Sequence, residues 1–271
     1  MFSQNFQLLS QLAQSNPNPR SLGPYSHRHR ILTVGDGNLS FSLSLASGLS
    51  ARNLTATTFD SYPQLLEKYS ESDNIVRTLR ALGAAVWHSV DATDFEKLPA
   101  SAAAAALAGP FDRVIFNFPH IGGSTPEDVV TNQELLTGFF KSAMLRLAPE
   151  TGEIHVALRR TVFYDSWKIV DLAKAAGLVL VKIVPFDAQA FAGYEPRRTS
   201  PATREAPSTQ SARIYSFKVA PVAREKKGKA EGEEEEEGAG PKVLSKSGKN
   251  RKRQQKKQKK LKRLSEKSKG E

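Results

Sequence analysis

Short apolar runs alternate with longer helical stretches along most of this chain. The runs long enough to form strands are residues 31–34, 54–59, 85–90, 113–118, 153–158, 178–184 and 212–219. Helices are expected between them, at about 39–48, 63–83, 94–108, 131–147 and 165–176. This alternation predicts an α/β fold in which helices cover both faces of a mostly parallel, seven-stranded sheet. The nearly all-apolar run 113–118 is typical of a central strand buried on both faces.

Both ends of the chain differ from this alternating region. Residues 1–28 contain Asn-Pro and Gly-Pro dipeptides, which break regular structure, and are expected to form a flexible leader. Residues 221–271 hold 18 Lys and Arg against 9 Asp and Glu, with few apolar side chains, so an acidic and then basic disordered tail is expected. The folded domain is therefore predicted to span residues 29–220.

Missing residue types exclude several function classes. The chain has no cysteine, which excludes disulfides, thiolate metal sites and cysteine nucleophiles, and no metal is expected. It has no apolar run of 18 residues and no secretory signal, so no membrane partner is expected. The acid-free start of the chain, with Arg20, Arg28 and Arg30, also loosely fits a mitochondrial transit segment.

The turn after the first predicted strand has the pattern of a cofactor site. Residues 34–40 read Val-Gly-Asp-Gly-Asn-Leu-Ser. Glycines at such a turn let the backbone approach a ligand, and the amides at the start of the next helix can bind it. A serine replaces the third glycine of the dinucleotide fingerprint, which favours S-adenosylmethionine over NAD. The candidate cofactor-binding residues here are Gly35, Asp36, Gly37, Asn38 and Ser40, and an ordinary turn is the alternative.

Acidic residues follow the next two predicted strands. Asp60 comes 25 residues after Gly35, where a carboxylate can accept hydrogen bonds from both ribose hydroxyls. Asp91 follows the third strand, where S-adenosylmethionine-dependent methyltransferases commonly hold the adenine amino group. A helix N-cap is the alternative role for either carboxylate. Together with the glycine turn, the two residues predict a Rossmann-like class I methyltransferase.

The fourth predicted strand ends in Asn117-Phe118-Pro119-His120. Ligands of open α/β sheets bind at the carboxyl ends of the strands, so this tetrapeptide should face the transferred methyl group. It is similar to the Asn/Asp-Pro-Pro-aromatic motif of amino-group methyltransferases. Asn117 would orient the nucleophile, Pro119 would fix the turn, and His120 would act as a base or stack on the substrate base. A plain turn is the alternative, and His155 is expected to be a core histidine.

Longer strings carry a specific resemblance. Residues 31–42 (ILTVGDGNLSFS), 111–122 (FDRVIFNFPHIG) and 152–156 (GEIHV) resemble the eukaryotic large-subunit (25S-type) ribosomal RNA uridine-N3 methyltransferase family, as do residues 132–136 and 193–199. The resemblance covers roughly residues 29–219. The resemblance implies an enzyme located in the nucleus, in the nucleolus. There it would act on pre-ribosomal particles and methylate N3 of a uridine in ribosomal RNA. A non-catalytic Rossmann-fold protein of ribosome assembly is the alternative.

Basic and aromatic residues suggest where the RNA would bind. Tyr194, Arg197 and Arg198 lie in the polar loop between the last two strands, beside the predicted site, and suit an extruded base and its phosphates. A solvated charged loop is the alternative. The Lys/Arg clusters of the tail would add phosphate attraction that does not depend on sequence, and they could also serve as a nucleolar address.

Overall fold

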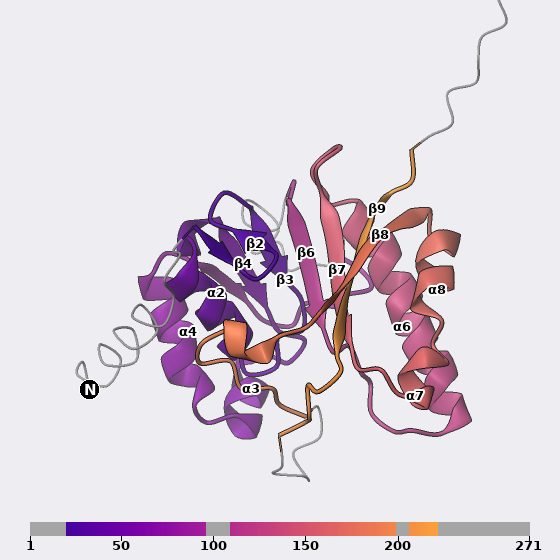
Figure 1. Cartoon of the computed structure of the whole chain (residues 1–271). Helices are drawn as coiled ribbons and strands as arrows, with labels where there is room; N and C mark the ends of the chain where they lie inside the picture. Colours follow the sequence, from indigo (N-terminus) through magenta and orange to yellow (C-terminus); the bar gives the residue numbers. More distant parts are fainter. Residues whose placement is uncertain (1–19, 96–108, 199–205, 222–271) are drawn as a thin grey trace, which may run out of the picture. The chain divides into compact units, whose positions relative to one another are not determined.

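A seven-stranded sheet forms the centre of the protein (Figure 1). The computed structural model describes residues 20–95, 109–198 and 206–221. The strands in sheet order are β5 (Ala85–Trp87), β4 (Leu54–Thr57), β3 (Ile31–Thr33), β6 (Arg113–Asn117), β7 (Glu153–Leu158), β9 (Arg213–Val219) and β8 (Leu178–Pro185). Within this sheet, only the pairings made by β9 are antiparallel. The mostly parallel sheet predicted from the alternation of apolar runs is therefore confirmed.

Helices cover both faces of this sheet (Figure 1). One face packs against α2 (Ser40–Gly48), α3 (Tyr62–Lys68) and α4 (Ser72–Ala81). The other face packs against α6 (Pro126–Met144), α7 (Val162–Asp165) and α8 (Ile169–Ala175). Two 3-10 turns, η1 (Ala51–Asn53) and η2 (Ala188–Ala190), lie between these elements. The two hydrophobic clusters hold the layers together, since each buries one helical layer against β-branched and aromatic strand residues.

Some predicted helix limits are wrong. The region 63–83 holds two helices, α3 and α4, and the region 165–176 holds only the last residue of α7 and then α8, with a break near Lys168, whose φ is +52°. The apolar periodicity continues across both breaks because the helices on either side of each break pack on the same cluster. The helix expected from 131 begins instead at Pro126, because Thr125 and Asp128 form a capping box around its first turn. Most of the helix expected at 94–108 lies outside the described residues.

The predicted leader is too long at its C-terminal end. The strands β1 (Ser21–Leu22) and β2 (Tyr25–Ser26) form a hairpin within the predicted leader, and the Tyr25 side chain is only 1% exposed. The Gly-Pro pair that argued against structure makes the turn of this hairpin, where Gly23 has a φ of +55°. The rest of the leader, residues 1–19, and all but the first residue of the predicted tail lie outside the described residues.

His155 lies in the core of the domain, as the sequence predicts. It is 1% exposed, and its Nε2 lies 2.8 Å from Glu153 Oε2. Burial lowers the pKa of His155 despite the neighbouring carboxylate, so the neutral ring donates an Nε2–H hydrogen bond to Glu153. That hydrogen bond and Arg113 lower the pKa of Glu153 to about 2.

Candidate active site

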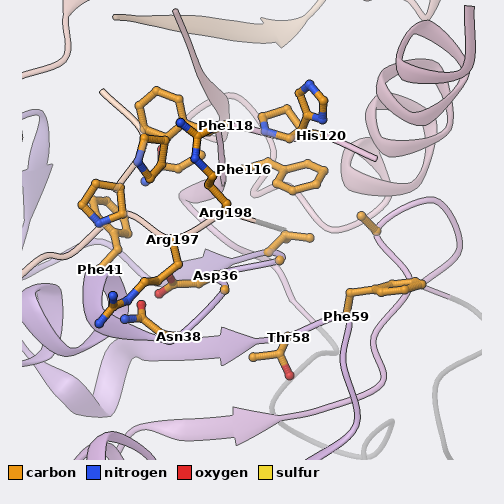
Figure 2. Close-up of a pocket in the computed structure, with 18 of the residues that line it drawn as sticks. Asp36, Asn38, Phe41, Thr58, Phe59, Phe116, Phe118, His120, Arg197 and Arg198 are labelled. Atoms are coloured by element: carbon orange, nitrogen blue, oxygen red, sulfur yellow. The ribbon is translucent and has the colours of Figure 1, made fainter. Parts of the chain in front are cut away.

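A cavity of about 750 Å³ opens at the carboxyl ends of the central strands. It lies where the strand order reverses around β3, the position at which open α/β sheets bind ligands. Figure 2 places Asp36, Asn38 and Arg197 on one side of this cavity and Phe118 and His120 on the other. Among the residues predicted from the sequence, those that line the cavity are Gly35, Asp36, Gly37, Asn38, Asp60, Asp91, Asn117, Pro119, His120, Tyr194, Arg197 and Arg198. Within the described residues, no group of three His, Asp or Glu side chains could hold a metal ion, and no helix is long and apolar enough to cross a membrane.

The glycine turn is shaped by its contact with β6. Gly35 has a φ of +58°, and a Cβ atom at this position would lie 2.8 Å from the ring of Phe116. Asp36 accepts hydrogen bonds from the backbone N–H and the hydroxyl of Ser42, and burial raises its pKa to about 6. The contact of Gly35 with β6 and the hydrogen bonds of Asp36 to the first turn of α2 therefore fix the conformation of this turn.

Ser40, predicted to bind the cofactor, bonds to a distant loop of the protein. Its hydroxyl donates to the carbonyl of Glu195 at 3.1 Å and accepts from the N–H of the same residue at 3.0 Å, and it does not line the cavity. Asn38 accepts from the N–H of Ser40 and donates to Glu71. The first residue of α2 thus turns its hydroxyl toward residues 194–198, and cofactor binding by Ser40 stays a prediction.

Residues 194–198, which we call the strap, cross the glycine turn. Tyr69 donates a hydrogen bond to the carbonyl of Arg198 at 2.8 Å. The guanidinium of Arg197 lies 2.8 Å from Glu71 and 2.9 Å from Glu195. Arg197 was predicted to contact RNA, but its charge is balanced within the protein by Glu71 and Glu195. Tyr194 is mostly buried against Phe41, with ring centroids 5.5 Å apart.

The two predicted acidic residues differ in their surroundings. Asp60 lies at the cavity wall, where its Oδ1 accepts a 2.6 Å hydrogen bond from Lys68. Asp91 accepts hydrogen bonds from the backbone N–H and the hydroxyl of Thr93 within a turn. Beside Asp60, the ring of Phe59 is 71% exposed and lines the cavity (Figure 2). Phe59 could not be predicted as a site residue from the sequence, because an apolar residue beside a strand-ending aspartate is not a distinctive pattern.

The strand end at Asn117 carries an unsatisfied donor. The Nδ2 atom of Asn117 is buried and has no hydrogen-bond partner among the described residues. Phe118 follows with a φ of +52°, and its N–H is bonded to Ala157. Because buried amide groups nearly always have partners, this donor at a cavity wall indicates a ligand acceptor.

His120 lies in an aromatic wall and has one nitrogen engaged. Its Nδ1 accepts a 2.7 Å hydrogen bond from the N–H of Gly122, so the neutral ring carries its proton on Nε2. Its ring centroid lies 5.7–5.9 Å from the rings of Phe163, Tyr164 and Trp167. Burial lowers the pKa of His120. The ring therefore presents a donor rather than a basic nitrogen, which argues against the predicted general base.

Asn132, which the sequence marked only within a family string, supports the loop after His120. The side chain is fully buried, accepts from the N–H of Ile121 at 3.1 Å and donates to the carbonyl of Asp128 at 2.7 Å. The sequence pattern that could have indicated Asn132 is a polar amide on the buried face of a helix.

Arg159 was not predicted from the sequence. It follows β7, lines the cavity and lies over the Tyr164 ring, 5.7 Å from its centroid.

Comparisons with known proteins show what the chain is similar to. A family model described as BMT5-like, rRNA (uridine-N3-)-methyltransferase, matches residues 32–198. The chain is similar to heavy metal-associated isoprenylated plant protein 41 of Arabidopsis thaliana, with 39% identity over 64% of this chain and 34% of that protein. It is also similar to the 25S rRNA (uridine(2634)-N(3))-methyltransferase of Saccharomyces cerevisiae, with 23% identity over 72% of this chain and 74% of that protein.

The coverage of relatives and structures varies. The chain spans about a third of the plant relative's length and 27% of the human ferredoxin-fold anticodon-binding domain-containing protein 1, which is 34% identical over 61% of this chain. Among solved structures, a TehB-like SAM-dependent methyltransferase from Corynebacterium glutamicum aligns with a TM-score of 0.40 at 14% identity, over 81% of this chain and 96% of that one.

Proposed function

Because this chain belongs to the BMT5-like family of rRNA (uridine-N3-)-methyltransferases, we propose that it methylates N3 of a uridine in large-subunit ribosomal RNA, with S-adenosylmethionine as the methyl donor. The observation that carries the proposal is the unsatisfied Asn117 amide in the same cavity as the glycine turn. A donor at the end of β6 can bind a carbonyl oxygen of a base while the turn holds the cofactor.

The residues present fit S-adenosylmethionine. Gly35 has no room for a Cβ atom, as expected of a turn that must leave its backbone open to a ligand. Asp60 lies at the cavity wall beyond β4 and can accept from the ribose hydroxyls, while the exposed ring of Phe59 can lie against the adenine. Bound here, the cofactor supplies an electrophilic methyl group on a positively charged sulfur. Asp36, Gly37, Asn38 and Asp91 are the further candidate contacts, since all four line the cavity.

The opposite wall suits a single extruded uracil. Uracil presents two carbonyl oxygens on either side of N3, and Asn117 can donate to one of them. Pro119 fixes the turn that follows, and the His120 ring, backed by Phe163 and Trp167, offers a flat surface on which a base can stack. Asn117 and His120 therefore orient the base in the cavity.

The RNA partner and the location follow from this substrate. Ribosomal RNA is methylated during ribosome assembly, so we infer that the protein acts on pre-ribosomal particles in the nucleolus. Arg198 lies at the cavity and can meet a phosphate of the bound strand. Residues 221–271 carry the excess Lys and Arg of the chain, and we infer that they attract the RNA backbone outside the domain 29–220.

The test is mass spectrometry of nucleosides. Purified full-length protein, S-adenosylmethionine and large-subunit RNA from cells that lack this protein should together yield N3-methyluridine. An Asn117→Ala variant should yield far less. Cofactor and RNA binding without any N3-methyluridine would instead support the non-catalytic assembly protein, and a different methylated nucleoside would refute the uridine assignment.

A further inference from the structure

The arginines at the mouth of the cavity are not equivalent. Arg160 pairs with Asp165 at 2.9 Å, and Arg197 pairs with Glu71 and Glu195. Arg159, directly after β7, lines the cavity, and within residues 20–95, 109–198 and 206–221 it makes no ion pair with a carboxylate. Its guanidinium lies over the ring of Tyr164 instead, 5.7 Å from the centroid. Its positive charge therefore lies at the wall of the cavity in which the substrate would bind, over the ring of Tyr164.

The proposed reaction needs a positive charge at this place. N3 of uracil carries a proton, and its electron pair can attack only when that proton is lost or leaving. The anion that remains spreads its charge over N3 and the two carbonyl oxygens. His120 has its Nδ1 engaged by Gly122, so the ring is poorly arranged to remove the proton. Stabilisation of the anion by a nearby cation achieves the same end, because it makes N3 more acidic.

We propose that Arg159 is a catalytic residue that stabilises the uracil anion from which N3 is methylated. This role rests on the proposed function. The N3–H bond breaks, its electron pair stays on N3, and the proton passes to hydroxide from the solvent, which becomes water. The guanidinium donates to one carbonyl oxygen of the anion, and Asn117 donates to the other. Tyr164 holds the guanidinium by a cation–π contact.

The charged groups around Arg159 allow this role to be read from the pH dependence of the rate. Tyr164 on α7 and His120 after β6 face it directly, Arg198 on the strap acts on Tyr164, and Asp128 on α6 acts on His120. Burial raises the pKa of Tyr164 and lowers the pKa of His120. Neither group therefore titrates between about pH 7 and 9.5, and the rate in that range reports the acidity of N3.

A substitution of Arg159 should shift this acidity. A cation within about 4–6 Å of an anion changes its pKa by about 1–3 units. In Arg159→Gln, the pH midpoint of the methylation rate should rise by about 1–3 units, and the rate at pH 7 should fall about 10- to 1,000-fold. Arg159→Lys keeps the charge without the planar contact to Tyr164, so its midpoint should lie nearer that of the unsubstituted protein.

The experiment measures single-turnover methylation from pH 6.5 to 9.5 on RNA that carries either uridine or 5-fluorouridine at the target position. Fluorine makes N3 more acidic by withdrawing electrons, so it should restore the rate of Arg159→Gln more than it raises the rate of the unsubstituted protein. Arg160→Gln is the matched control, since its guanidinium pairs with Asp165 outside the cavity lining, and it should keep the original profile. RNA affinity and unfolding are measured in parallel.

Two outcomes are decisive. An Arg159→Gln variant whose pH midpoint and response to 5-fluorouridine match those of the unsubstituted protein would overturn the role, and any fall in its rate would then reflect docking or packing. Absence of N3-methyluridine with the unsubstituted protein would overturn the proposed function itself, and this role with it.

Discussion

Alanine substitution of two asparagines near the same loop should affect different properties, the methylation rate in one case and the stability of the fold in the other. Asn117 at the end of β6 has an Nδ2 donor without a partner, whereas Asn132 on α6 uses both ends of its amide, bonding Ile121 and Asp128. Alanine at 117 removes an unsatisfied group, and alanine at 132 creates one. The pair therefore separates a side chain kept for a ligand from one kept for the fold.

The magnitudes follow from the hydrogen bonds. Asn132→Ala leaves the N–H of Ile121 without its acceptor, and a buried group that loses its partner costs about 1–3 kcal/mol, to which the loss of packing adds. We expect the free energy of unfolding to fall by about 2–3 kcal/mol. Asn117→Ala should change it by less than about 1 kcal/mol, because the relieved donor offsets the lost contacts. Its methylation rate should fall about 100-fold, as when one donor to a developing anion is removed.

Urea unfolding gives the stabilities, calorimetry with S-adenosylmethionine gives the cofactor affinity, and single-turnover methylation gives the rate. Cofactor affinity should be unchanged in Asn117→Ala. If this variant lost as much stability as Asn132→Ala while keeping its methylation rate, Asn117 would be a structural residue and the orphaned amide would not mark the substrate site.

Three further predictions concern the cofactor, the core and the tail. Asp60→Ala should weaken S-adenosylmethionine binding by about 1–3 kcal/mol in calorimetry, through loss of a ribose acceptor, and an unchanged affinity in a folded variant would remove Asp60 from the site. The pKa of Glu153 falls from 4.5 to about 2 on folding, so its contribution is complete above pH 4.5 and is lost as the pH falls toward 2. Glu153→Gln should therefore flatten the stability profile between those values by about 2–3 kcal/mol in unfolding measurements, and an equally steep profile would contradict this. Deletion of residues 222–271 should leave cofactor affinity intact but lower RNA affinity and its salt dependence, and a matching salt slope would exclude the tail as the electrostatic anchor.

The sequence by itself determined the layers of the protein and the edge at which its site lies. Strand β7 (Glu153–Leu158) has the predicted bounds, and the other six strands lie within or one residue beyond theirs. Burial imposes a period on each strand and helix, and that period is written in a few neighbouring residues. The glycine turn and the strand-ending Asn117 could be found for the same reason, since both are local features at the ends of apolar runs.

Only the tertiary structure decided what each polar side chain in the site does. Ser40 and Glu195 are 155 residues apart in the chain, and no local pattern could show that they bond to each other. Arg159 and Arg160 are neighbours in the sequence, yet one lies over Tyr164 at the cavity and the other pairs with Asp165. The role of a charge or an amide depends on which partners reach it through space, and packing between distant segments chooses those partners.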